Sequence, residues 1–277
     1  MYLDQKTHPV YELKVDVSNV SRLFEYYLLL EKIKPEHSVL DIGCNTGTGM
    51  DILSLKSNDV CGIDVIPTLA PILSSKYDSN PKISWKIVDE GGLGFQKKFD
   101  WIVASNFIEH VPNPKYYIEE FKKHLKPNGI LYLTTVNRNI RLFPWQKPYN
   151  QHHFTEYSTR SLKRLVKPYF KECTLGGIIK DEPFFPNYMA NSFKQKVDFG
   201  IKLPLKCFLM NLKRGRISFK NPVESPENTP PVSTEPNHKI EQFNLDDFLP
   251  YFKHLREDFT HSNNWVELVC YCKSENS

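Results

Sequence analysis

Five short apolar runs, separated by stretches long enough for a helix, constrain the fold of this chain more than any other feature. They are residues 38–44, 59–65, 83–89, 99–106 and 129–137. Several are apolar throughout their centres, as expected of strands that are covered on both faces. Strands joined by crossover helices form a parallel sheet wound in βαβ units. The sequence therefore predicts a Rossmann-like α/β fold with helices on both faces of the sheet.

Three later segments extend this pattern. Residues 158–170 open with Ser158, a residue suited to capping a helix, and residues 171–180 and 264–273 have the composition of strands. We expect the late strand to pair with 171–180 at the edge of the sheet. The prediction is a seven-stranded, mostly parallel sheet whose last strand is antiparallel.

The interval before the last strand predicts an insertion. We assign residues 1–180 to the core with an N-terminal helical segment, 181–262 to the insertion, and 263–277 to the final strand and tail. Within the insertion, 244–257 is expected to be helical, and 221–237 is a loop rich in Pro, Glu, Ser and Thr. Its aromatic residues are expected to build an acceptor pocket; they are Phe184, Phe185, Tyr188 and Phe193.

Composition limits the partners, metals and cellular compartment that we expect for the protein. A net charge of +4 is too small to indicate nucleic acid. The six cysteines form no CxxC pair and no zinc pattern, so we expect no metal and a reducing, cytoplasmic compartment. We find no secretory signal and no apolar stretch of membrane-spanning length. The basic stretch 202–220 is interpreted either as a solvated helix face or as a peripheral contact with a membrane surface.

The stretch "SVLDIGCNTGTGM" predicts a ligand-binding turn at the end of the first strand. Gly43 allows a sharp turn and Gly47 a close helix approach, while Asn45 tolerates the positive φ that a middle glycine would supply. Asp41 lies at the strand end, where it would repel a pyrophosphate but suit an ammonium group. The turn therefore favours a ligand with an amino acid at one end.

Polar residues also follow the next strands. Asp64 is placed to accept hydrogen bonds from both hydroxyls of a ribose, and Asp89 to meet an adenine amino group, although "DEGG" is also typical of a plain turn. Asn106 follows the fourth strand. Because ligands of open α/β sheets bind at the carboxyl ends of the strands, these side chains predict one site.

Together these motifs resemble the class I S-adenosylmethionine-dependent methyltransferases, in the branch that includes ubiquinone- and menaquinone-biosynthesis enzymes. The matching stretches are "VLDIGCNTG", "GIDV", "IVDE", "FDWIVASNFIEHVPNP", "FKKHLKPNGILYLTTVN" and "HHFTEYSTRSLKRLV". The resemblance covers roughly residues 36–180 and resumes at the last strand. It implies S-adenosylmethionine as cofactor, S-adenosylhomocysteine as product, and a methyl group transferred by in-line attack on the sulfonium.

The resemblance also implies a role for each residue of the cofactor site. The methionine portion would be surrounded by Asp41, Gly43, Cys44 and Asn45, with Asn106 offering its carbonyl to the ammonium. Asp64 would hold the ribose. The adenine would pack on Val65 and Ile66 and be bracketed by Asp89 and Glu90.

A hydroxyl acceptor needs a base, and three histidines are candidates: His110, His152 and His153. His110 could equally orient its loop, and either of the pair could pack against the following helix. A carbon or amine acceptor would need only positioning and desolvation. No D/N-P-P-Y/F motif follows the fourth strand, so we expect a small-molecule, lipid-linked or sugar acceptor rather than a nucleic acid base.

Two alternatives stay open at this point. An NAD-dependent Rossmann oxidoreductase would share the wound sheet, but Asp41 and the glycine spacing disfavour it. A methyltransferase-like module could bind the cofactor without catalysis.

Overall fold

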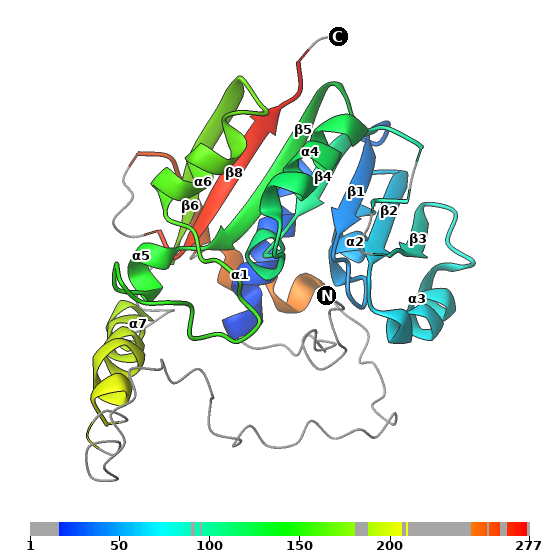
Figure 1. Ribbon diagram of the computed structural model, residues 1–277. Helices are drawn as coiled ribbons and strands as arrows, with labels where there is room; N and C mark the ends of the chain where they lie inside the picture. The colour runs from blue at the N-terminus through cyan, green and yellow to red at the C-terminus, as the bar shows by residue number, and fades with distance from the viewer. Residues whose placement is uncertain are drawn as a thin grey trace.

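A single eight-stranded sheet organises the computed structural model, which describes residues 17–89, 92–94, 96–180, 188–206, 209, 245–253, 255–260 and 265–275. The strands lie in the order β3-β2-β1-β4-β5-β8-β6-β7 (Figure 1). Their bounds are β1 Ser38–Ile42, β2 Asp59–Asp64, β3 Ile83–Ile87, β4 Phe99–Ala104, β5 Leu125–Val136, β6 Glu172–Lys180, β7 Leu255–Asp258 and β8 Glu267–Lys273.

All seven strands that the sequence predicted are present, and the first five are parallel. The expected pairing of the last strand with 171–180 is confirmed, but its expected position at the edge is wrong. β8 does not lie at the edge but inserts antiparallel between β5 and β6. Its Cys270 lies opposite Leu133 of β5 on one side and opposite Leu175 of β6 on the other. In this central position the apolar side chains of β8 are buried on both faces of the sheet, which an edge would leave exposed.

The edge is formed instead by β7, the eighth strand, which pairs antiparallel with β6. It falls in the part of the expected insertion that was predicted to be helical. Only the first half of that segment is helical, in η5 (Leu245–Asp247) and α9 (Leu249–Phe252). Leu255 then leads into the strand, with alternate residues facing the core.

Helices cover both faces of the sheet, as predicted. One face carries α1 (Val17–Tyr27), α2 (Thr48–Leu53), α3 (Ala70–Tyr77) and α9, and the other carries α4 (Pro114–His124) and α6 (Thr159–Val166). The two apolar clusters between helices and sheet bury large side chains completely, among them Tyr132 on the first face and Phe99 and Phe121 on the second.

Local sequence explains how two of these helices begin. Ser158 caps α6 with a reciprocal capping box, because its hydroxyl accepts from the amide of Ser161 while the Ser161 hydroxyl accepts from the amide of Ser158. Asn113 precedes α4, and Pro114 occupies its first turn. α4 ends at His124, and "PNG" forms a bulged part of β5 in which Asn128 has φ 61°.

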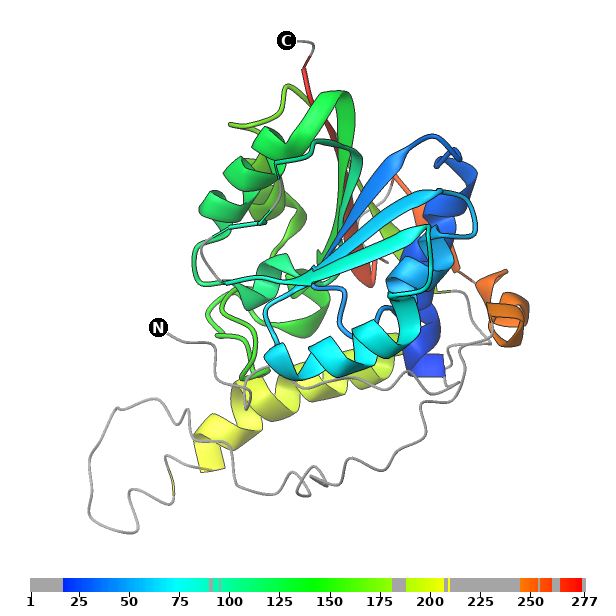
Figure 2. The same ribbon diagram turned by 90° about the vertical axis from the view of Figure 1, so that its right-hand side faces the viewer.

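α7 (Tyr188–Val197) lies outside the two helix layers, beside the short helix α5 (Arg138–Arg141) (Figure 2). It continues through a π-turn, Asp198–Lys202. Of the aromatic residues expected to form an acceptor pocket, only the side chain of Phe193 is among those described, and it is 61% exposed. In the described part of the chain, no helix has the length and apolar character needed to cross a membrane.

Candidate active site

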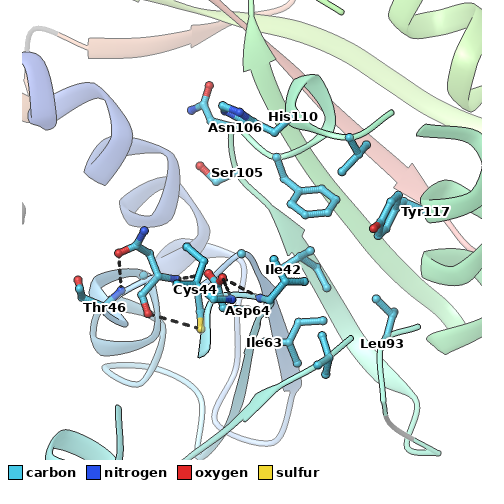
Figure 3. Close-up of a pocket in the computed structure, with 18 of the residues that line it drawn as sticks. Ile42, Cys44, Thr46, Ile63, Asp64, Leu93, Ser105, Asn106, His110 and Tyr117 are labelled. Atoms are coloured by element: carbon cyan, nitrogen blue, oxygen red, sulfur yellow. Dashed lines mark hydrogen bonds between the residues drawn. The ribbon is translucent and has the colours of Figure 1, made fainter. Parts of the chain in front are cut away.

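A cavity opens at the carboxyl ends of β1, β2 and β4, where the fold brings together the turns after the parallel strands and the side of α1 (Figure 3). Most of the predicted cofactor residues line it: Gly43, Cys44, Asn45, Asp64, Val65, Ile66, Asp89 and Asn106. Asp41 lies fully buried at the end of β1, beneath the turn. Glu90 lies outside the described residues.

The turn after β1 depends on three left-handed residues, Gly43 (φ 71°), Asn45 (φ 48°) and Gly47 (φ 89°). The expectation that Asn45 replaces a glycine at positive φ is therefore confirmed. Gly47 also has no room for a side chain, since a Cβ atom there would lie 2.2 Å from the Tyr77 hydroxyl oxygen. That hydroxyl donates to the Gly47 carbonyl at 2.9 Å, so α3 holds the turn closed.

The backbone amides of this turn are already engaged within the protein. Those of Gly43 and Cys44 donate to the Ile63 carbonyl, that of Asn45 to Asp64, and that of Gly47 to the Cys44 carbonyl. These hydrogen bonds make the turn rigid. The Arg22 side chain of α1 lines the same cavity and could pair with a ligand carboxylate.

Asp64 is held rigidly at the end of β2. One carboxylate oxygen accepts from the amide of Asn45 at 2.9 Å, and the other accepts from the amides of Val65 and Ile66 at 2.7 and 3.1 Å. Three amide donors fix the carboxylate while it lines the cavity, which suits it to bind a diol. Val65 and Ile66 follow as an apolar wall.

The pKa of Asp41 is unusually high for an acid at the end of a strand. Burial raises its pKa to about 7, against the opposing effect of the Tyr26 hydroxyl, which donates to its Oδ1 at 3.0 Å. Among the described residues, none supplies a hydrogen-bond partner to its Oδ2. An orphaned buried acceptor beside the turn is the group that a ligand ammonium would satisfy.

The end of β4 is ordered by Glu25, which is fully buried on α1. Its carboxyl group accepts from the hydroxyls of Ser105 and Thr134 and, at 3.0 Å, from the side-chain amide of Asn106. Asn106 has φ 45°, a conformation that this network holds in place. Burial, together with the neighbouring Glu267, raises the pKa of Glu25.

Of the three predicted catalytic histidines, His110 lines the cavity, at the end of the 3-10 turn η3 (Ile108–His110). Its Nδ1 lies 2.9 Å from the carbonyl oxygen of His152. Because a carbonyl only accepts, Nδ1 carries the proton, and Nε2 is the basic nitrogen of the neutral ring. His152 thus contributes its backbone to the orientation of His110 and does not itself line the cavity.

His153 lies behind His110, with the two ring centroids 4.7 Å apart. Its Nδ1 is 2.9 Å from Glu156 and its Nε2 is 3.0 Å from the Asn150 amide nitrogen, so both nitrogens have partners within the protein. Glu156 is in turn paired with Arg141. His153 does not line the cavity, and this geometry gives it a positioning role.

Glu109 completes the group under His110. One of its oxygens accepts from the Thr135 hydroxyl at 2.8 Å, and burial raises its pKa. The ligand atoms of Glu109, His110 and His153 lie within 4.8 Å of one another. The carboxyl group is thus close enough to stabilise a positive charge on the histidine pair.

Three functional residues escaped the sequence prediction: Arg22, Glu25 and Tyr26, all on α1. They lie at i, i+3 and i+4, so they share one face of the helix. Polar residues at that spacing in the largely apolar stretch 22–30 were the available signal. Only the fold shows that this face lies against the turns after β1 and β4.

Comparison with known proteins agrees with this geometry. Residues 16–169 match the family model described as a methyltransferase domain. The chain therefore belongs to the methyltransferase domain family, in the class that uses S-adenosylmethionine.

The curated relatives belong to the same class. The ubiquinone biosynthesis O-methyltransferase of Pelagibacter ubique is 31% identical over 106 residues, which cover 38% of this chain and 44% of the relative. That of Rickettsia typhi is 29% identical over 124 residues, covering 42% and 50%. The chain thus spans about half the length of the curated relatives it matches.

Two solved structures share the fold. One is the [4+2]-cyclase SpnF (TM-score 0.52, 13% identity, covering 91% of this chain and 80% of that one). The other is a methyltransferase from Thermotoga maritima described as a possible histamine N-methyltransferase (TM-score 0.51, 15% identity, covering 93% and 90%).

The residues of the cavity fit S-adenosylmethionine. The orphaned Asp41 oxygen matches an ammonium, Arg22 a carboxylate, and the fixed Asp64 carboxylate a ribose diol. Val65, Ile66 and Leu93 give apolar walls for a purine, with Asp89 at its polar edge. Asp41 would repel the pyrophosphate of NAD, so this acid and the family match both argue against the oxidoreductase alternative.

Proposed function

We propose that this protein transfers a methyl group to a hydroxyl of a small, apolar, phenolic acceptor, with His110 as the general base. The observation that carries the proposal is the tautomer of His110. Its Nδ1 proton is fixed by the carbonyl of His152, which leaves Nε2 as the basic nitrogen of a residue that lines the cofactor cavity.

Bound S-adenosylmethionine supplies the methyl group together with a neutral thioether leaving group. The protein aligns the acceptor oxygen with the methyl carbon and excludes water. His110 takes the proton of the hydroxyl as the new O–C bond forms. The positive charge that develops on the ring is stabilised by Glu109, one of whose oxygens lies within 4.8 Å of a His110 ring nitrogen.

The walls next to His110 support an apolar, aromatic acceptor. Phe107, Val111 and Tyr117 line this part of the cavity. Phe107 and Tyr117 contact edge to face, with ring centroids 5.2 Å apart. The curated relatives are named as O-methyltransferases of ubiquinone biosynthesis, which points to the same acceptor class. A sugar acceptor would need more polar walls.

The surface around α7 supports an acceptor that carries a lipid chain. Apolar side chains project into solvent here: Phe193, Phe199, Ile201, Leu203, Leu205 and Leu209. Lys194, Lys196, Lys202 and Lys206 accompany them. We therefore extend the proposal to peripheral contact with an anionic membrane surface. The expected basic stretch 202–220 is described only at 202–206 and 209.

The part of the insertion at 181–220 is proposed to cover the acceptor, since α9 and β7 place 245–258 in the core and at the edge of the sheet. Deletion of 181–220 is expected to abolish transfer while cofactor binding persists, as measured by titration with S-adenosylhomocysteine. Unchanged turnover in the deletion variant would show that this segment is not part of the acceptor site. The five described cysteines are unpaired thiols, four of them buried, which supports a cytoplasmic location as part of this proposal.

The test uses a catechol that bears a short prenyl chain, with its fully O-methylated form as the blank. His110→Gln is expected to lower kcat by about 10²–10⁴-fold, the usual contribution of a general base, while the Kd for S-adenosylhomocysteine stays unchanged. His124→Gln is the matched control, because that histidine caps α4 through the Glu120 carbonyl and does not line the cavity.

Equal kcat values for His110→Gln and the wild type would refute the role of His110. Cofactor binding without methylation of any phenolic, amine or sugar acceptor would instead favour a non-catalytic module.

A further inference from the structure

Three cysteines that are far apart in the sequence converge on one face of the sheet, away from the cofactor cavity. Cys173 on β6 lies directly opposite Cys272 on β8, and Cys270 lies two residues along the same strand, on the same face. The three Sγ atoms lie within 4.8 Å of one another, and those of Cys270 and Cys272 are 3.3 Å apart. None of the three residues lines the cofactor cavity.

The surroundings of this cluster are apolar and closed on one side. Cys270 and Cys272 are fully buried in the core cluster beneath α6, which crosses in front of β6 and β8 (Figure 1). Cys173 is half-buried, and its thiol donates to the Phe170 carbonyl. A ligand could therefore reach the buried pair through the exposed side of Cys173.

The spacing of the sulfur atoms suits a metal ion better than a disulfide. A thiolate–metal bond of about 2.3 Å in a trigonal arrangement places the sulfurs about 4.0 Å apart. The Cys270 and Cys272 sulfurs are 3.3 Å apart, and all three sulfurs lie within 4.8 Å of one another. Small side-chain rotations therefore suffice. A bridge between Cys270 and Cys272 would need a bond of about 2.05 Å between positions two apart on one extended strand.

We propose that Cys173, Cys270 and Cys272 form a three-sulfur site for one thiophilic monovalent cation, with copper(I) as the ion that fits. Soft thiolate ligands select such ions. Zinc favours four ligands, and within the part of the chain that the structure describes, this cluster contains only three metal-ligating side chains.

Charge supports the choice of a monovalent ion. Lys163 on α6 places a positive charge near Cys173. One copper(I) ion with two thiolates and one thiol carries a net charge of −1, which Lys163 compensates. Binding would release two protons from the thiols, and no atom would change its oxidation state.

The test is a competition for copper(I) between the reduced, full-length protein and a coloured copper(I) chelator under anaerobic conditions. The wild type is expected to withdraw one equivalent, seen as loss of the visible absorbance of the chelate. Cys173→Ala is expected to withdraw none at the same chelator concentration. Because Cys173 is half-buried, this variant should fold, and circular dichroism checks that it does.

Cys61→Ala is the matched control, since Cys61 is a buried strand cysteine outside the cluster, and its uptake should equal that of the wild type. The bound ion should also raise the Tm of the wild type but not that of Cys173→Ala, because an ion that binds only the folded state stabilises it. The proposal is overturned if the wild type withdraws no copper(I), or if Cys173→Ala withdraws as much.

Discussion

Replacing Asp64 tests the cofactor site most directly. Its carboxylate accepts from three backbone amides at 2.7 to 3.1 Å and is 7% exposed. A hydrogen bond to a charged group contributes about 1.5–3 kcal/mol. Loss of the one acceptor that would hold the ribose should therefore weaken S-adenosylhomocysteine binding by about 10–150-fold in Asp64→Ala. Because the cavity admits water to the freed amides, we expect the free energy of unfolding to fall by only about 2–3 kcal/mol.

Isothermal titration with S-adenosylhomocysteine measures the first effect, and urea unfolding measures the second. Asp64→Asn keeps one acceptor oxygen and should lie between Asp64→Ala and the wild type in both assays. Asp59→Ala is the control, since Asp59 lies exposed at the other end of β2 and should leave the affinity unchanged. An Asp64→Ala protein that is folded and binds with the wild-type Kd would refute the placement of the cofactor.

Three further predictions concern the same end of the sheet and the start of helix α6. Asp41→Asn should stabilise the cofactor-free protein. The pKa of Asp41 is about 7 in the folded protein, against its ordinary value of 3.8, so the wild type loses up to about 4 kcal/mol of unfolding free energy as the pH rises through that interval. Urea unfolding from pH 5 to 8 should show a gap that widens with pH and levels off above 7, and a constant gap would contradict this account. Gly47→Ala should lower the unfolding free energy by about 2–4 kcal/mol, because the new side chain would sit at positive φ and overlap with Tyr77. Gly92→Ala is the control: no atom lies closer than 4.0 Å to its Cβ position, so the unfolding free energy should change by less than about 0.5 kcal/mol. Equal effects of the two substitutions would be inconsistent with the overlap. Ser158→Ala should remove about 1 kcal/mol by breaking the capping box and lower Tm by about 2–4 °C in a thermal melt, and an unchanged Tm would show that the cap is replaced by water.

Most of the core could be predicted from the sequence, because it depends on local chemistry. A buried parallel strand must be apolar at its centre, and a turn at positive φ needs glycine or asparagine, so β1 and its turn are apparent from "VLDIGCNTG". Asp41 and Asp64 lie at the carboxyl ends of β1 and β2, as predicted, because the carboxyl ends of parallel strands meet at one edge of a sheet. These features depend only on residues close together in the chain.

The failures involve contacts between distant residues. The alternating pattern of β8 identifies a strand but not its neighbours, and the burial available between β5 and β6 decided that it lies inside the sheet. The residues of β7 were predicted to be helical because four residues are too few to show the alternating pattern of a strand. The weak local preference for helix is overridden by pairing with β6.

The histidines show the same division. From the sequence alone it follows that His110 comes after the fourth strand, and that His152 and His153 come after the fifth. The fold is needed to show that His110 lines the cavity with a fixed tautomer. It also shows that both ring nitrogens of His153 have partners within the protein, Glu156 and Asn150. The physical reason is that a side chain's role is set by its partners, and these come from separate segments that the fold alone brings within hydrogen-bonding distance.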